Sequence, residues 1–263
     1  MGFRRIPILL VLIAAAGAFL PARAAGWSAE KFPAGETLEF EIGWAFITAG
    51  TARMTADFGP GGAPRIRAYA ENNGVFESVY RVADTSASVL DGKTGLPTRF
   101  DKINNEGSWH SRSHIRFDQA GGTAHLSDSV FDGDGVPKPG RSVDTLIALD
   151  GPSWDILSAF YLFRTLPLEN GGVHLFHAVS GKKKYAMKVL VHRRERVKVP
   201  AGVFDCVVVE PILADDGLFK AKGTLTIWLT DDEDRVPVLV KSKIALGSIK
   251  IELTSRKAPA PFR

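Results

Sequence analysis

The acidic run Asp231-Asp232-Glu233-Asp234 is the stretch of this sequence that most resembles a chemical site. Clustered carboxylates can bind a metal ion or act as an acid–base pair. Calcium loops, however, place their carboxylates at alternate positions and need a glycine to turn the chain. Here the four carboxylates are consecutive, and no glycine follows them. The run also separates two alternating apolar segments, 223–230 and 235–242, so the sequence favours the solvated turn of a β-hairpin.

Carboxylates from adjacent strands can also form a catalytic pair, as in enzymes that cleave polysaccharides. Asp231, Asp232 and Glu210 are the candidates for such a pair in this chain. Catalysis would require them to lie in a cleft, whereas a hairpin tip is usually exposed to solvent. The sequence therefore predicts no catalytic residues, and an enzyme acting on envelope polysaccharide remains the alternative.

The remaining metal-ligand types are scattered. His110 and His114 are four residues apart, but their segment alternates as a strand, which would separate them by roughly 13 Å. Cys206 is the only cysteine, and it lies in a β-branched run typical of a buried, inert thiol. We therefore expect no metal site and no cofactor.

One segment must form a helix rather than a strand. Residues 154–165 follow turn-forming residues and a potential cap at Ser153, and they end before Pro167. The helix has almost no polar face, so it must be covered, and the simplest cover is a curved sheet. We predict that its ligand-contacting side chains are Trp154, Phe160, Tyr161, Phe163 and Arg164.

Asp155 and Arg164 are the charged residues of this helical segment, and they allow two interpretations. In the first, Asp155 stabilises the first turn and Arg164 the last, each through the helix dipole. In the second, Arg164 lies at the mouth of an apolar cavity, where it holds the anionic group of a ligand whose apolar part contacts the aromatic residues.

The rest of the chain alternates with a period of two, in short runs separated by Gly, Pro, Asn and Asp. This pattern predicts an all-β fold: a curved antiparallel open barrel or β-spiral of about twelve strands, wrapped around one buried helix at about 154–165. Residues 88–103 repeat the hairpin design of 226–244, with Pro97 and Pro237 each starting a strand.

The N-terminus has the features of an export signal. Arg4 and Arg5 precede an apolar run from Ile6 to Leu20, and a small-x-small site predicts cleavage near Ala24-Ala25. We assign residues 1–24 to a signal peptide, 25–257 to a single antiparallel β domain with the inserted helix, and 258–263 to a loose tail. These features predict a soluble protein of the bacterial periplasm that does not span the membrane.

The net charge of the chain without its signal peptide argues against nucleic acid as a partner. Removal of the signal peptide leaves 30 basic against 29 acidic residues, so the domain is nearly neutral. We therefore expect no nucleic acid as a partner. An envelope lipid, an envelope glycan or a periplasmic protein remains open as a partner.

Three segments resemble a known bacterial family, the domain of unknown function 3108. They are "GETLEFEIGW", the helix "DILSAFYLFRTLPL" and the end of the chain from "VPAGVFDCVVVEPIL" through "GTLTIWLTDDEDRVPVLVKSKIALGSIKIEL". The resemblance covers about residues 33–255 and implies an exported antiparallel β protein; it supplies no catalytic residues. The architecture is also similar to that of periplasmic lipoprotein carriers and β-spiral envelope proteins, although fold alone does not license function.

These observations support three hypotheses. The first is a periplasmic, non-catalytic binding or scaffold protein that supports envelope integrity and holds a lipid or amphiphile in an apolar groove. The second is the polysaccharide-active enzyme with paired carboxylates. The third is a module that binds only another envelope protein through exposed strand edges.

Overall fold

The computed structural model describes residues 27–44, 47–74, 80–213, 225–244 and 247–259. The strands in these ranges are β1 (Thr37–Trp44), β2 (Ile47–Phe58), β3 (Pro64–Asn72), β4 (Ala83–Leu90), β5 (Pro97–Glu106), β6 (Trp109–Asp118), β7 (Thr123–Phe131), β8 (Val143–Ala148), β9 (Ser153–Trp154), β10 (Val173–Ser180), β11 (Lys183–Val199), β12 (Gly202–Leu213), β13 (Leu225–Thr230), β14 (Pro237–Ile244) and β15 (Gly247–Lys257). The helices are η2 (Ala29–Lys31), η3 (Pro60–Gly62) and α2 (Ile156–Phe163).

All fifteen strands belong to one sheet. Its order is β8-β7-β6-β5-β4-β3-β2-β1-β15-β14-β13-β12-β11-β10-β9. Adjacent strands in the sheet are also consecutive in sequence, except that β1 pairs with β15 and so joins the two ends of the chain. The consecutive strands β8 and β9 lie at the two opposite edges. The β9–β10 pair is parallel, and the other pairs are antiparallel. The sheet does not close, because β8 and β9 each have one unpaired edge.

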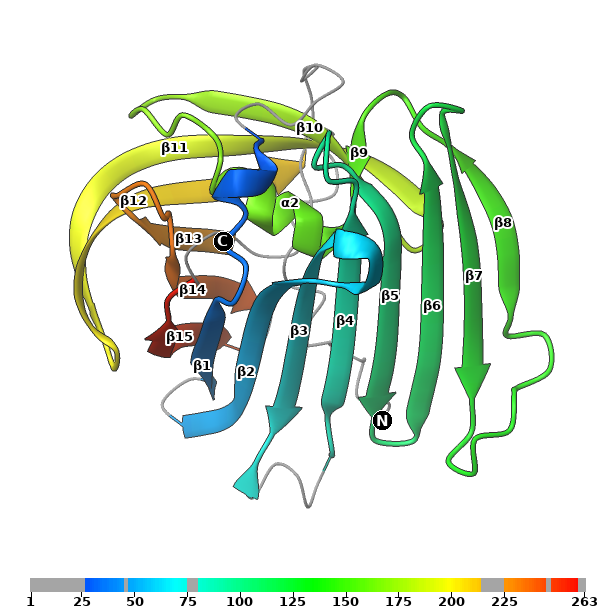
Figure 1. Ribbon diagram of the computed structural model, residues 1–263. Coiled ribbons are helices and arrows are strands. Elements are labelled where there is room, and N and C mark those ends of the chain that lie inside the picture. The colour runs from blue at the N-terminus through cyan, green and yellow to red at the C-terminus, as the bar shows by residue number, and fades with distance from the viewer. Residues whose placement is uncertain (1–26, 45–46, 75–79, 214–224, 245–246, 260–263) are drawn as a thin grey trace.

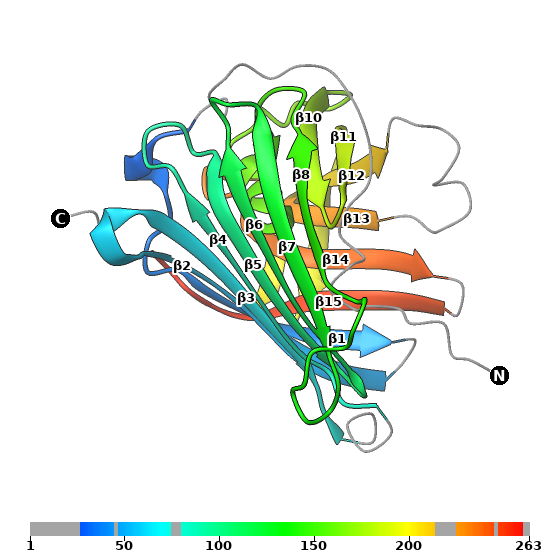
Figure 2. The ribbon, with the colours of Figure 1, turned by 90° about the vertical axis from the view of Figure 1, so that its right-hand side faces the viewer.

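The sheet is strongly curved. Figure 1 shows β2 to β8 as a wall on one side and β10 to β15 bending round on the other, with α2 between the two arms. In Figure 2, β13 to β15 run across behind β3 to β8 in a clearly different direction. The predicted open, curved, antiparallel fold around a buried helix is therefore confirmed.

Alternation of residue types decides which face of each strand is buried. In β1, Leu38, Phe40 and Ile42 are buried, and the residues between them are less buried. The inward side chains of both arms meet α2 in one large apolar core, which includes Trp154, Phe160 and the other apolar residues of the helix. This burial is the main stabilising contribution to the fold.

The two hairpins with similar sequences also have similar structures. The β4–β5 register shifts at the pair Leu90–Pro97, and the β13–β14 register shifts at the pair Leu229–Pro237. A shift at each proline is expected, because proline cannot donate a hydrogen bond to the neighbouring strand. The hairpin similarity predicted from sequence is thus a real repetition of local geometry.

The structure differs from the approximate prediction in two details. The sheet has fifteen strands rather than about twelve: β8 and the two-residue β9 were not predicted. The helix begins at Ile156 rather than at residue 154, because Trp154 pairs with Ala178 in the sheet. The predicted signal peptide and residues 260–263 of the predicted tail lie outside the described residues.

Candidate functional site

Asp155, not Ser153, caps α2. Its Oδ1 accepts hydrogen bonds from the backbone N–H groups of Leu157 at 2.8 Å and of Ser158 at 3.0 Å, and the Ser158 hydroxyl accepts one from the Asp155 N–H. This is a reciprocal capping box. The second carboxylate oxygen accepts from the Ser88 hydroxyl on β4 at 2.6 Å. Complete burial raises the pKa of Asp155, against the opposing effect of these hydrogen bonds.

The five side chains predicted to contact a ligand lie together around the helix. Trp154, Phe160, Tyr161 and Phe163 are all buried in the large core. Trp154 and Phe163 both meet the ring of Phe176 on β10 at steep angles, with ring centroids 5.8 and 5.5 Å away, a favourable aromatic arrangement. A ligand-binding role for the five residues stays a prediction.

Arg164 ends the helix and joins a buried ionic cluster. Its Nη1 and Nη2 donate to the two carboxylate oxygens of Glu36 at 2.6 and 3.0 Å, in the bidentate geometry that suits guanidinium. Arg256 on β15 donates to the same carboxylate at 3.0 Å and also pairs with Asp234. We call Glu36, Arg164, Asp234 and Arg256 the ionic clasp, because they tie four distant parts of the chain together.

The acidic turn is a structural element of the β13–β14 hairpin. Oδ1 of Asp232 accepts from the Thr230 hydroxyl and from the backbone N–H groups of Asp234 and Arg235, which closes the turn. Asp231 pairs with Arg194 at 2.6 Å and with Arg235 at 2.9 Å. The hydrogen bond from Arg194 is the main reason that the pKa of Asp231 is lowered. The hairpin-turn prediction agrees with this geometry.

The third carboxylate considered for catalysis lies apart from the turn. Glu210 on β12 contacts His192 at 2.7 Å. Cys206, on the same strand, is fully buried, and burial raises the pKa of its thiol to about 12. The described residues contain no group of three or more His, Cys, Asp or Glu that could hold a metal ion.

A polar region on the inner face of β4 and β5 was not predicted from the sequence. It consists of Asp84, Ser86, Lys102, Asn104 and Glu106, and we call it the inner polar wall. Four of the five residues are buried, with exposed fractions between 0 and 8%, and Lys102 is partly buried. Ser86 lies opposite Lys102 in the β4–β5 register. The nearby Glu106 carboxyl group acts to lower the pKa of Asp84.

Several atoms of the inner polar wall lack a hydrogen-bond partner within the protein. They include Asp84 Oδ2, Ser86 Oγ and Asn104 Oδ1. Buried polar atoms in native proteins are nearly always bonded, and each exception costs about 1–3 kcal/mol and needs an explanation. Asp84 Oδ2 and Asn104 Oδ1 are hydrogen-bond acceptors, so a ligand that bonds to them would have to supply hydrogen-bond donors.

The charges of the wall shift one another's pKa values. Burial raises the pKa of Asp84, and the hydrogen bond from the Asn105 backbone and the charge of Lys102 act against that rise. Burial likewise lowers the pKa of Lys102, while Asp84, Glu106 and Asp128 act to raise it. Lys102 thus faces three carboxyl groups, and one of them, Asp128, also lies near the charge of Lys182.

An apolar strip continues the same inner face on the other side of Asp84. Asp84 is paired with Ala70 on β3, and Ala70 with Ala52 on β2. Ile42 and Ile249 complete a small buried cluster with Ala70. This end of the inner face is therefore amphipathic: it is polar on β4 and β5 and apolar on β3, β2, β1 and β15.

The sequence contained a faint signal of the wall. In β4 the buried positions are Asp84, Ser86, Ser88 and Leu90, so polar residues occupy the face where alternation predicts apolar ones. Polar residues at core positions are exceptions to the usual pattern and mark structural or functional requirements. Ser88 is explained by its bond to the helix cap, whereas Asp84 and Ser86 are not explained by the helix.

The fold and this inner face define a class: an open, curved, all-β protein with one helix plugging its concave side. The comparisons agree with this class and give the family. The model of the family described as "Protein of unknown function (DUF3108)" matches residues 39–254, and the chain belongs to that family. No curated protein matches the chain.

One solved structure shares the architecture. A β-barrel-like protein of the domain of unknown function DUF1849, from Brucella abortus, has a TM-score of 0.55 and 9% sequence identity, over 87% of this chain and 98% of that one. A protein with a YmcC-like fold from Bacteroides fragilis is less similar, with a TM-score of 0.30 and 11% identity, over 86% of this chain and 98% of that one. Among the described residues, no helix has the length and apolar character needed to cross a membrane.

Proposed function

We propose that this chain is a non-catalytic binding protein of the bacterial periplasm that supports the cell envelope by holding an amphiphile on its inner face. The observation that carries the proposal is the set of buried, unbonded acceptor atoms in the inner polar wall, beside the apolar strip. A ligand with hydroxyl or ammonium donors on its head group and an apolar remainder matches both parts. The export signal predicted for residues 1–24 supports the periplasm as its location.

The position of the wall supports entry of a ligand from one end of the sheet. Glu106 is the last residue of β5, and Asp84 is the second residue of β4, so the wall lies at the lower rim of the sheet in Figure 1. The helix α2 packs against β3, β4, β9 and β10, and its cap binds Ser88, further along β4. The helix cap and its bond to Ser88 are therefore separate from the wall.

The test is native mass spectrometry and lipid extraction of the protein purified from the periplasm. We expect an amphiphile with a hydroxyl- or amine-bearing head group to co-purify. Ser86→Ala and Asn104→Leu should carry much less of it and still fold, because each removes a polar atom that the protein leaves unbonded. Ser129→Ala is the matched control, since Ser129 lies on the opposite face of the sheet, beside the exposed Arg112.

Two results would disprove the proposal. One is that no amphiphile co-purifies with the wild-type protein. The other is that both wall variants carry as much ligand as the Ser129→Ala control. The helix prediction is tested in the same experiment with Phe160→Ala: a change in stability without loss of ligand would remove the helix face from the binding site.

A further inference from the structure

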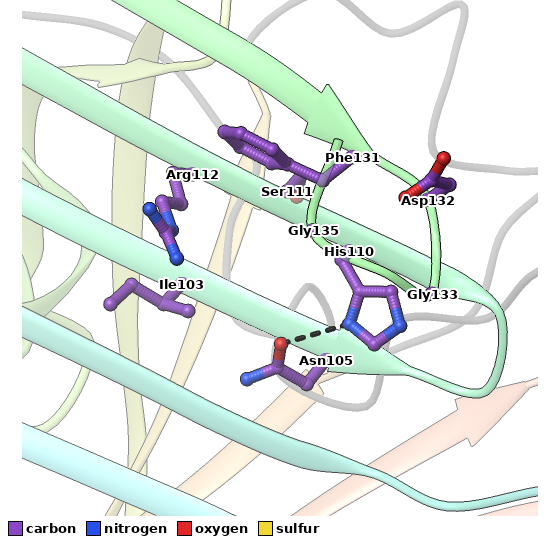
Figure 3. Close-up of a pocket in the computed structure, with 9 residues that line it drawn as sticks. All are labelled: Ile103, Asn105, His110, Ser111, Arg112, Phe131, Asp132, Gly133 and Gly135. Atoms are coloured by element: carbon purple, nitrogen blue, oxygen red, sulfur yellow. Dashed lines mark hydrogen bonds between the residues drawn. The ribbon is translucent and has the colours of Figure 1, made fainter. Parts of the chain in front are cut away.

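A pocket lies on the outer face of the sheet, away from the inner polar wall. Figure 3 shows its lining residues, which come from β5, β6 and the end of β7 with the loop that follows. The lining residues are Ile103, Asn105, His110, Ser111, Arg112, Phe131, Asp132, Gly133 and Gly135. His110 lies opposite Asn105 on one side and Phe131 on the other, so these three side chains share one face.

Arg112 presents a cation to this pocket. Its guanidinium carbon lies 4.9 Å from the centre of the Phe131 ring, a stacked position that holds the side chain in place. No carboxylate within the described ranges pairs with it. By contrast, Arg99 and Arg116, on the same two strands, bond to Asp101 and His114. The N–H donors of Arg112 are therefore available to an anionic group.

His110 presents an acceptor. The Asn105 side chain donates from Nδ2 to the Ala83 carbonyl at 3.1 Å, which turns its Oδ1 toward His110 Nδ1, 3.0 Å away (Figure 3). Because an amide oxygen only accepts, the proton of the neutral imidazole lies on Nδ1. Nε2 is then left with a lone pair, and it accepts a hydrogen bond from a ligand hydroxyl.

Asp132 limits which anions fit. Its Oδ1 accepts from the backbone N–H groups of Asp134 and Val136, which fixes the loop at the pocket margin. The negative charge that it places there opposes a dianion more strongly than a monoanion. A carboxylate is thus favoured over a phosphate.

We propose that this outer pocket binds a carboxylate on a hydroxylated carbon framework, as in an acidic sugar. The carboxylate accepts hydrogen bonds from Arg112, a neighbouring hydroxyl donates to His110 Nε2, and the carbon framework lies against Ile103. Such a ligand can be a free hydroxy acid or a uronic acid unit of a glycan, and both offer the same chemistry. This site lies on the opposite face from the inner polar wall and does not depend on the function proposed above.

The experiment is an NMR titration of the full chain with glucuronate, a glucuronate-containing oligosaccharide, glucose and inorganic phosphate. We expect both glucuronate ligands to shift the amide signals of residues 103–112 and 131–135. The ligand that binds more tightly shows whether the pocket favours a free hydroxy acid or a uronic acid unit of a glycan. Arg112→Met should weaken binding by about tenfold or more, the effect of losing a hydrogen bond to a charged group. Asp132→Asn should strengthen it.

Arg116→Met is the control, because Arg116 is an exposed arginine on the same strand but outside the pocket. Equal binding of glucose and glucuronate would overturn the proposal, as would tighter binding of phosphate. An equal loss of affinity in Arg112→Met and Arg116→Met would also overturn it, since it would show only a general effect of surface charge. Absence of any shift with either glucuronate ligand would do the same.

Discussion

The ionic clasp should make an unusually large contribution to stability for a salt bridge. Arg164→Met removes two charge-assisted hydrogen bonds to Glu36, at 2.6 and 3.0 Å, and one to the Asp234 carbonyl at 3.0 Å. Glu36 is fully buried, and the Arg164 side chain is only 6% exposed, so the lost partner is not replaced by water. Removing one member of a buried pair costs about 3–5 kcal/mol.

The stability lost in Arg164→Met should fall at the lower end of the range of about 3–5 kcal/mol. Arg256 still donates to the Glu36 carboxylate in the variant, so the remaining charge keeps one partner. We expect a loss of about 3 kcal/mol in the free energy of unfolding. For a chain of this size that corresponds to a fall in Tm of roughly 6–12 °C. Chemical denaturation and calorimetry measure the two quantities.

A matched control comes from an exposed pair of the same type. Arg53 donates from two nitrogens to one oxygen of Glu39, at 2.7 and 3.1 Å, but the two side chains are 61 and 41% exposed. Arg53→Met should therefore cost about 1 kcal/mol or less. The reasoning is refuted if the two variants lose equal stability. If Arg164→Met instead keeps its stability and loses a bound anionic amphiphile, then the ligand-holding interpretation of Arg164 is correct.

Two further predictions concern buried titratable groups. Asp84→Asn should raise the free energy of unfolding near neutral pH, because it removes a carboxylate whose folded-state pKa is raised by burial. Wild-type Asp84 takes up a proton in the folded state before it does so in the unfolded state, so the advantage of the variant should shrink as pH falls through the raised pKa. Denaturation of both proteins at about pH 7.5 and about pH 4.5 measures the difference in free energy of unfolding between variant and wild type, and a difference that does not change with pH contradicts the prediction. Cys206 should resist alkylation in the native protein and react in denaturant, because it is buried with a thiol pKa of about 12. Rapid alkylation of the native protein, measured by mass spectrometry, would show that β12 opens.

The architecture could be predicted from sequence because it depends on local patterns. Period-two alternation is clear in β1, where every second residue from Leu38 to Ile42 is buried. The two missed strands had weak local signals. β8 is an edge strand in which the apolar residue Leu146 is exposed, so apolar residues do not mark its buried face. β9 has only two residues, too few to show a period-two pattern.

The candidate site could not be predicted to the same degree, because its contacts are distant in sequence. Glu36 and Arg164 are 128 residues apart, and nothing near either of them indicates the other. The inner polar wall required the β4–β5 register, which places Ser86 opposite Lys102. Sequence identified the charge of Arg164 as unusual, but only the fold shows that a buried carboxylate binds it.

The pairing of β1 with β15 has a consequence for how the chain folds. Every other antiparallel neighbour in the sheet is also a neighbour in sequence, so most hairpins can form as soon as their own residues are available. The β1–β15 ladder runs from Thr37–Lys257 to Trp44–Ile249, and it closes a loop of nearly the whole chain. The hairpins of the two arms can therefore form separately, but the β1–β15 ladder cannot form until synthesis has reached the last strand. A chain truncated before β15 would keep an unpaired β1 edge, and such edges promote aggregation.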